Sequence, residues 1–363
     1  MRKLKENLLK SLIYLSAFFT VSMLVVIVGY IFIKGIGGVN LSFLTSDYSA
    51  DGSGGILPMI VTTLYTVILS IAIATPIGIL SAIYLQEYAK KGKIVNAIRF
   101  ATESLAGIPS IIYGLFGGIF FVVVLNLKYS ILSGALTVAI IILPVIIRTT
   151  EEALKTVPDG YREASLALGS TKFQTLYKVV LPSAIPGILS GVILSVGRVV
   201  GESAAILLTA GTVAQMPGGI FDSARNLTVH AYLLTKEKGD IASAASIGIV
   251  LIFIVEIMNN IVRYFSNYSY NRFFYDVRRN LQLELARETL RVEQRELNNN
   301  SSGVFIERIN ADTDNLTDIF AALIDYTTSI IGNIGILISV LMVNIYIGLA
   351  YCVFIVIIFF YNK

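Results

Sequence analysis

The sequence predicts an all-α, polytopic membrane protein built on a core of six transmembrane helices. Hydrophobic residues make up 55% of its 363 residues, and the mean hydropathy is +0.76. Only 14% of the residues are charged, whereas soluble domains carry about 25%. Apolar runs long enough to cross a bilayer, about 20 residues each, recur along the chain. Much of the surface is therefore expected to face lipid.

Six such runs precede residue 265, and each is expected to be one span. The first follows a basic N-terminal segment, a pattern shared by signal peptides and retained signal anchors. Its length and the lack of a small-residue cleavage site favour a retained anchor. The expected spans are 11–34, 56–86, 108–126, 131–147, 187–210 and 241–262.

The basic residues predict the orientation of these spans. Lys and Arg are concentrated in the N-terminal segment, in 87–100, in 148–186 and after residue 262, whereas 35–55 has none. Because cytoplasmic loops of membrane proteins carry an excess of Lys and Arg, the basic segments are assigned to the cytoplasm. This places both ends of the six-span unit, including the N-terminus, on the cytoplasmic side of the membrane.

Several kinds of chemistry are disfavoured by the sequence. Cys352 is the only cysteine, so an intrachain disulfide is impossible. His230 is the only histidine and has no second metal ligand at suitable spacing, so we expect a surface residue in an external loop. No phosphate-binding G-x-x-x-x-G-K-[ST] motif occurs. If ATP drives this protein, ATP and its Mg²⁺ bind to another chain.

The segment 151–187, between the fourth and fifth spans, is predicted to form two short helices on the cytoplasmic face. Apolar residues recur at helical spacing from Tyr161 to Leu168, and Gly169 is placed to end that helix. Ser170 or Thr171 would cap a second helix, which Pro182 is expected to stop. Two short helices around a glycine form a compact projection suited to a groove on a partner.

This segment resembles the EAA loop of ABC-importer permeases. The resemblance rests on Glu163, Ala164, Gly169, Leu181 and Pro182, with Ser165 and Val179 departing conservatively from the pattern. It implies that the loop couples the permease to a separate ATPase subunit. A generic interfacial loop is the alternative. The resemblance further implies a transport subunit that is not an enzyme, has no cofactor of its own and has no nucleic-acid partner.

Two further segments are similar to phosphate-importer permeases. They are LAGIPSIIYGLFG, at 105–117, and GRVVGESAAILLTAG, at 197–211. The MPGG and DSA elements between the last two spans are similar to the A-type subunit. For residues 1–262, the resemblance implies a phosphate importer with a second permease subunit, an ATPase dimer and an external phosphate-binding protein.

Arg198 and Glu202 are the candidate residues of the anion pathway. A charged side chain within an apolar span is costly and often functional. A guanidinium suits phosphate oxygens well, and on a continuous helix residues four apart share a face. The pair is therefore predicted to bind or gate an arriving anion. The alternative is that Glu202 only neutralises Arg198 within the membrane.

The last hundred residues, 263–363, differ in composition from the core. Charges of both signs crowd 271–296, where apolar residues at helical spacing predict an amphipathic helix. Two further apolar runs follow, at 320–343 and 345–361. The pattern Arg279, Leu290, Gln294, Arg295, Asn299, Asn300, Gly303, Arg308, Ile309 and Asp312 resembles the first intracellular loop of ABC exporters. This implies a partial exporter-like fragment with a coupling helix near 294–300.

Several alternatives stay open at the level of sequence. The exporter-like segment is a recombination relic or assembly error, a lid or tether, or the remnant of an exporter half. The whole chain is a phosphate permease, a permease for another oxyanion such as sulfate, molybdate or phosphonate, a secondary transporter, or a non-transporting scaffold or hybrid. A secondary transporter is disfavoured because the chain lacks an evident internal repeat and contains an EAA-like loop.

Overall fold

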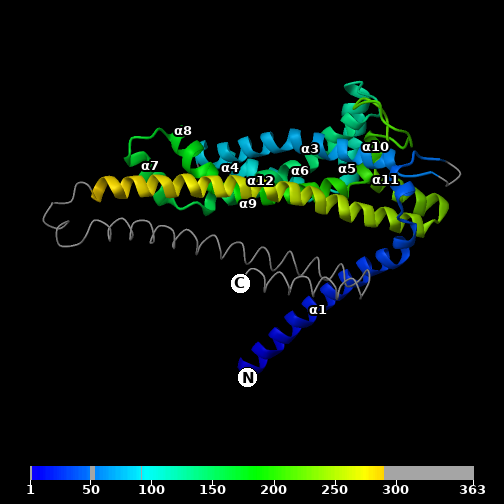
Figure 1. Ribbon diagram of the computed structural model, residues 1–363, viewed down its shortest axis with the longest axis horizontal. Helices are drawn as coiled ribbons and strands as arrows, with labels where there is room; N and C mark the ends of the chain where they lie inside the picture. The colour runs from blue at the N-terminus through cyan, green and yellow to red at the C-terminus, as the bar shows by residue number, and fades with distance from the viewer. Residues whose placement is uncertain (1, 50–53, 91, 290–363) are drawn as a thin grey trace.

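The computed structural model describes residues 2–49, 54–90 and 92–289, and every regular element in these ranges is helical. Four long helices run side by side along the molecule (Figure 1). They are α3 (Leu57–Ile83), α6 (Ile131–Thr156), α9 (Leu181–Val200) and α12 (Ile241–Thr289). The first helix, α1 (Arg2–Gly35), diverges from this bundle toward its N-terminus and meets α12 only near its other end.

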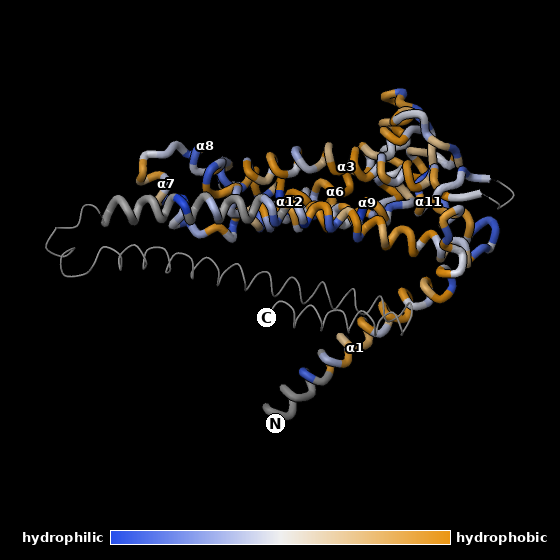
Figure 2. Tube along the Cα trace, viewed as in Figure 1, coloured by the Kyte–Doolittle hydropathy of each residue, from blue (hydrophilic) through white to orange (hydrophobic). Residues whose placement is uncertain are grey.

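The structure allows the six spans that were predicted. Five helices in the described part of the chain are long and apolar enough to cross a membrane, and the number is six if a sharply bent pair of helices counts as one span. That pair joins α4 (Lys93–Ala106) to α5 (Ser110–Gly117) and η3 (Gly118–Val124), with a bend of 100°. Figure 2 shows the apolar residues along the bundle and more polar ones around α7 and α8.

Core packing depends on small residues where helices cross. A Cβ atom on Gly35 would lie 2.5 Å from the Ala245 backbone, so only glycine permits this approach of α1 to α12. The Ser246 hydroxyl donates to the Gly35 carbonyl at 2.7 Å across the same contact. Between α3 and α6, Gly78 fits against Ile146 in the same way. A large buried apolar cluster lies among α3, α6, α9 and the two short helices α10 (Ala204–Thr209) and α11 (Leu227–Leu233).

The predicted bounds of the fourth and fifth spans were wrong. The helix expected at 131–147 continues to Thr156, and the span expected at 187–210 runs instead over Lys172–Val200. Pro182 does not stop a helix. The π-helical turn η4 (Leu176–Val180) precedes it, and the Leu181 N–H donates to the carbonyl of Leu176. The π turn carries the helix into the proline, whose missing N–H then falls in the first turn of α9.

The charged segment after residue 262 continues the last span as helix. α12 extends without interruption for 49 residues, about 74 Å at 1.5 Å per residue. A hydrocarbon core of about 30 Å accommodates less than half of that length. The helix expected over 271–296 is therefore observed, as far as Thr289, as a direct continuation of the last span. The exporter-like coupling helix near 294–300 and the two apolar runs after 320 lie outside the described residues.

Candidate functional site

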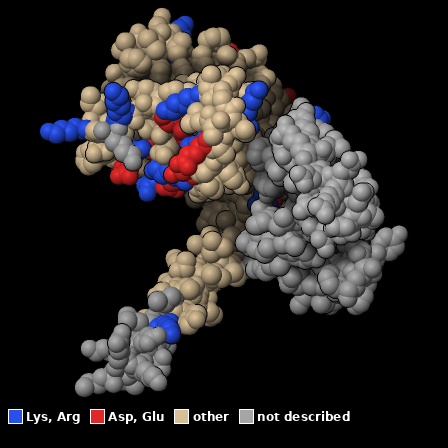
Figure 3. Space-filling model, turned by 90° about the vertical axis from the view of Figure 1, so that its left-hand side faces the viewer, with Lys and Arg blue, Asp and Glu red and all other residues tan. Residues whose placement is uncertain are grey.

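The predicted coupling loop is a compact projection at one end of the bundle, here called the knob (residues 157–175). It contains α7 (Asp159–Ala167) and α8 (Lys172–Thr175). Gly169 has φ +85°, the left-handed conformation that ends α7 as predicted. Thr171 caps α8, and a reciprocal capping box with Gln174 completes the turn. Figure 3 looks onto this end of the molecule and shows basic and acidic side chains close together.

The motif residues lie on different parts of the knob. Glu163 and Ala164 are exposed on α7, whereas Ser165 is buried and its hydroxyl lies 2.9 Å from that of Thr175. The serine that replaces the second alanine of the EAA pattern therefore joins α7 to α8. Leu181 and Pro182 begin α9 and are partly buried.

Large apolar side chains are exposed on the knob. Leu168 and Phe173 are 87% and 67% exposed, and the Phe173 ring stacks at 6.4 Å on that of Tyr177, in the π turn that follows the knob. Aromatic and aliphatic groups presented together at a polar end of a protein are typical of an interaction surface. The knob therefore has the composition of a docking site for a partner protein.

The two segments at 105–117 and 197–211 meet beside α6, away from the knob. Each contains a helix break, at 107–109 between α4 and α5 and at 201–203 between α9 and α10. A Cβ atom on Gly114 would lie 2.9 Å from the Cα of Ala205, so α5 packs directly on α10. Irregular backbone at membrane depth is tolerated where it is buried in protein or lines a polar path. The packing of these two broken helices against each other marks a candidate site, here called the double break.

Arg198 and Glu202 both lie at the double break, but the predicted pairing between them is not observed. α9 ends at Val200, so the two residues are not on one continuous helix face. Glu202 is buried, and its carboxylate accepts a hydrogen bond from the Ala205 N–H at 3.1 Å, in the first turn of α10. The Glu202 carbonyl accepts from Asn226 and Thr228, which fixes the break against α11.

Arg198 is left without a counter-ion among the residues that the structure describes. It is half-buried in the last turn of α9 and acts electrostatically on Tyr113 of α5. A guanidinium in this setting needs an anion, a partner subunit or water to satisfy its five donors. The absence of a described ion pair argues against simple neutralisation by Glu202, and the pathway role of Arg198 stays a prediction.

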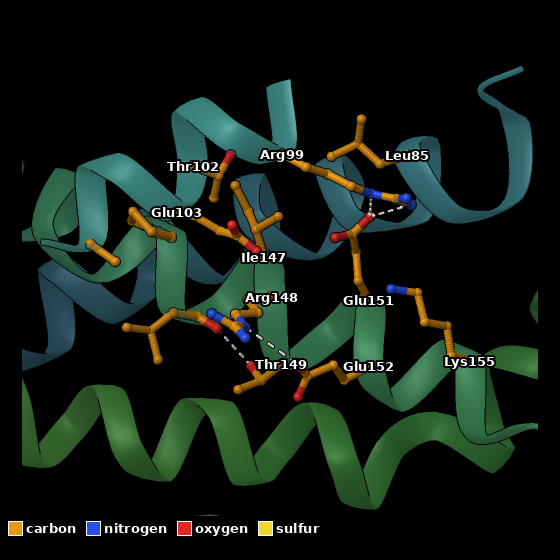
Figure 4. A pocket seen from close by; sticks show the side chains of 13 residues that line it. Leu85, Arg99, Thr102, Glu103, Ile147, Arg148, Thr149, Glu151, Glu152 and Lys155 are labelled. Carbon is orange, nitrogen blue, oxygen red and sulfur yellow. Dashed lines mark hydrogen bonds and ion pairs between the residues drawn. The ribbon is translucent and has the colours of Figure 1, made fainter. Parts of the chain in front are cut away.

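A pocket of about 480 Å³ lies between η2 (Tyr84–Tyr88), α4 and α6 (Figure 4). Its charges are largely paired within the chain. The Arg99 Nε and Nη2 atoms lie 3.1 and 3.0 Å from Glu151 Oε1, and Arg148 Nε lies 3.2 Å from Glu152 Oε1. Because three basic and three acidic residues line it, the pocket attracts an anion less than Arg198 does. The charged lining residues are Arg99, Glu103, Arg148, Glu151, Glu152 and Lys155.

His230 is not the surface residue that the sequence predicted. It lies on α11, is 3% exposed, and its ring meets Tyr48 edge-on at 5.5 Å between centroids. The Arg225 guanidinium covers the same tyrosine ring at 4.8 Å. Burial, together with the charges of Arg225 and Lys238, lowers the pKa of His230 to about 3. His230 lies in the short apolar helix α11, within a segment that was expected to be an external loop, and this explains the error.

The buried His230 predicts acid sensitivity. Its folded pKa of about 3 lies below the unfolded value of 6.5, so the unfolded chain binds the extra proton first as pH falls. The free energy of unfolding then falls as the pH drops below about 6.5, by at most about 1.4 kcal/mol per pH unit. We expect the thermal midpoint in detergent to fall between pH 7.5 and 4.5, and to fall less in His230→Phe, which retains a ring against Tyr48. An equal fall in both proteins would contradict this assignment.

Comparison with known proteins identifies the family. The family model described as "Binding-protein-dependent transport system inner membrane component" matches residues 74–267, more than half of the chain. The chain belongs to this family. The match includes the knob and both breaks of the double break, and it ends shortly after the last span of the core. This family membership makes the chain an inner-membrane transport permease, which is not an enzyme.

Individual relatives agree with this assignment. "Probable ABC transporter permease protein YqgI" of Bacillus subtilis is 34% identical over 289 residues, covering 75% of this permease and 98% of that protein. "Phosphate transport system permease protein PstA" of Pasteurella multocida is 39% identical over 211 residues, covering 58% and 75%. The alginate ABC transporter structure with a pentasaccharide-bound periplasmic protein matches with a TM-score of 0.53 and 16% identity, covering 74% of this permease and 94% of that chain. That likeness supports the fold alone.

Ion pairs between residues far apart in the sequence were not predicted. Arg99 with Glu151, and Arg162 with Glu87, join segments 52 and 75 positions apart. Each was visible only as one of several charges in a basic loop. Arg162 directly precedes the Glu163 of the coupling motif, which was the single hint of its importance.

Proposed function

We propose that this chain is the A-type permease subunit of an ATP-driven importer of inorganic phosphate. The observation that carries the proposal is Arg198, a half-buried guanidinium without a described counter-ion, placed where two broken helices meet. The sequences of both breaks are similar to phosphate permeases. Several relatives are phosphate transport permeases by name, including the 39% identical protein of Pasteurella multocida and a 38% identical protein of Mycobacterium leprae.

In the proposed mechanism the chain makes and breaks no covalent bonds. The knob docks on a separate ATPase subunit, which binds ATP and Mg²⁺. A second permease subunit completes the pathway, and an external phosphate-binding protein delivers the anion. The N-terminus and the knob face the cytoplasm, as the distribution of basic residues predicts. Closure of the ATPase dimer would then shift the equilibrium between inward-open and outward-open states.

The geometry of the fifth span supports coupling between the two sites. One helical segment, Lys172–Val200, begins in the knob and ends at the double break. Its 29 residues are about 43 Å long. Glu163, Ala164 and Gly169 would contact the ATPase side, while Arg198 and Glu202 serve the anion at the other end. A displacement of the knob along or about this helix would therefore reach the proposed anion site directly.

The experiment for substrate identity is competition for uptake. Cells that lack their own phosphate permeases would express this chain with its partner subunits, and uptake of labelled phosphate would be measured. Excess unlabelled phosphate should abolish uptake, whereas excess sulfate, molybdate or phosphonate should not. Inhibition by one of these other oxyanions at lower concentrations than phosphate would transfer the assignment to that anion.

The segment after Arg263 is proposed to be dispensable for transport. The family match ends at residue 267, and the exporter-like pattern between 279 and 312 stays a prediction. Uptake by the full chain would be compared with uptake by a chain that ends at Arg263. Equal uptake supports a dispensable segment, and greater uptake by the shorter chain would instead mark the segment as inhibitory.

A further inference from the structure

Arg162 joins the knob to two different spans. Its Nη1 donates to the Val157 carbonyl at 2.7 Å, and its Nη2 donates to the Leu154 carbonyl at 2.8 Å, at the end of α6. The same Nη2 lies 2.8 Å from Glu87 Oε1, in η2 at the end of α3. Asp159, on the same helix as Arg162, accepts a further hydrogen bond from Nη1 at 3.2 Å.

A second side chain of the knob contacts the same point of η2. The Lys172 ammonium donates to the Glu87 backbone carbonyl, and it lies 4.9 Å from the centre of the Tyr88 ring. α7 and α8 therefore each contribute one cation to the end of the α3–η2 helix. The side chains of Arg162 and Glu87 are 17% and 11% exposed, so water screens this ion pair little.

These contacts supply a link that the chain itself does not make. The knob follows α6 and leads into α9, so the backbone already connects it to those two spans. Glu87 lies 75 positions before Arg162, and α3 has no direct backbone connection to the knob. Motion of the knob reaches α3 through packing and through these contacts. Among them, the Arg162–Glu87 pair is a charge-assisted bond of good geometry.

We propose that Arg162 and Glu87 are a positioning pair that makes the knob and the cytoplasmic end of α3 move as one body. Through this pair, the displacement of the knob by the ATPase is delivered to α3 as well as to α6 and α9. The inference rests on the proposed docking of the ATPase on the knob. It assigns to these two residues a role in coupling, without contact to the transported anion.

The test uses Glu87→Gln with Asp159→Asn as its matched control. Both substitutions remove one carboxylate from the same guanidinium. Glu87 bridges two elements, whereas Asp159 is 89% exposed and lies within α7. Because removal of one partner of a buried ion pair is costly and that of an exposed partner is not, only Glu87→Gln should impair coupling.

The complex of the full-length chain with the second permease, the ATPase and the binding protein would be reconstituted in proteoliposomes. ATP hydrolysis and uptake of labelled phosphate would both be measured. We expect the ATP hydrolysed per phosphate imported to rise at least about fivefold in Glu87→Gln and to stay at the wild-type value in Asp159→Asn. A simple loss of folded complex lowers both rates together and leaves this ratio unchanged, which would overturn the proposal.

A distance measurement separates this inference from the identity of the substrate. Spin labels at Gly160→Cys in α7 and Tyr84→Cys in η2, in a Cys352→Ser background, would report the separation of the knob from α3. Gly160 has open space around its Cα, and Tyr84 is 58% exposed. We expect one narrow distance in both the nucleotide-free and vanadate-trapped complexes, and a changed or broadened distance in Glu87→Gln. A nucleotide-dependent change in the otherwise wild-type complex would refute the one-body link even if phosphate proved to be the wrong substrate.

Discussion

Replacing Arg198 with alanine is expected to lower phosphate uptake by roughly 10- to 100-fold while the complex still assembles. A hydrogen bond to a charged group contributes about 1.5–3 kcal/mol, and each 1.4 kcal/mol corresponds to about tenfold in an equilibrium. Arg198 has no described counter-ion that its loss would leave unpaired, so folding should tolerate the change. Initial uptake rates over a range of phosphate concentrations provide the measurement.

Two variants sharpen the test of Arg198. Arg198→Lys keeps the charge but loses the two-pronged geometry of the guanidinium, so it should restore only part of the uptake. Arg263→Gln removes an exposed cation from α12 and should leave uptake unchanged. Wild-type uptake by Arg198→Ala would place the anion pathway elsewhere, with the charged pocket beside α4 as the next candidate.

Reversing the charge of Glu163 should abolish uptake by separating the permease from its ATPase. Glu163 is exposed on α7, beside the apolar side chains that the knob presents. A like charge or an unpaired charge at a protein interface costs several kcal/mol. We expect the affinity of Glu163→Lys for the ATPase to fall by roughly 100-fold, so that the ATPase is lost during co-purification.

The appropriate control for Glu163→Lys is the same reversal at the other end of the bundle. Glu237 is exposed in η5 (Leu234–Lys238), so Glu237→Lys should retain the ATPase fully. Equal retention of the ATPase by Glu163→Lys and the wild type, with uptake intact, would show that the knob is not the docking site.

The features predicted correctly are those encoded by local sequence. A run of about 20 apolar residues has few alternatives to a transmembrane helix, which is why five of the six predicted spans are long apolar helices and the sixth is a bent helix pair. Gly169 and Thr171 were placed correctly because a left-handed C-terminal residue and a threonine N-cap are determined within one turn of helix. The helix in the charged segment was predicted from apolar spacing, and the structure shows it as a continuation of the last span.

The errors concern positions where the fold overrides local preference. Pro182 was expected to end a helix, but a π turn at 176–180 accommodates it. Arg198 and Glu202 were expected to pair because four-residue spacing implies one helix face, and the break after Val200 removes that face. His230 is buried by Tyr48, which is remote in sequence. Contacts such as Arg162 with Glu87 have no local signature at all.

The most direct test of the account is phosphate import by purified components. The full chain, its partner permease, the ATPase and the binding protein would be reconstituted in proteoliposomes, and labelled phosphate uptake measured with and without ATP. We expect uptake that requires both ATP and the binding protein, and that is lost in Glu163→Lys. Assembly with an active ATPase but no phosphate uptake, alongside ATP-dependent uptake of sulfate, molybdate or phosphonate with the corresponding binding protein, would contradict the phosphate assignment.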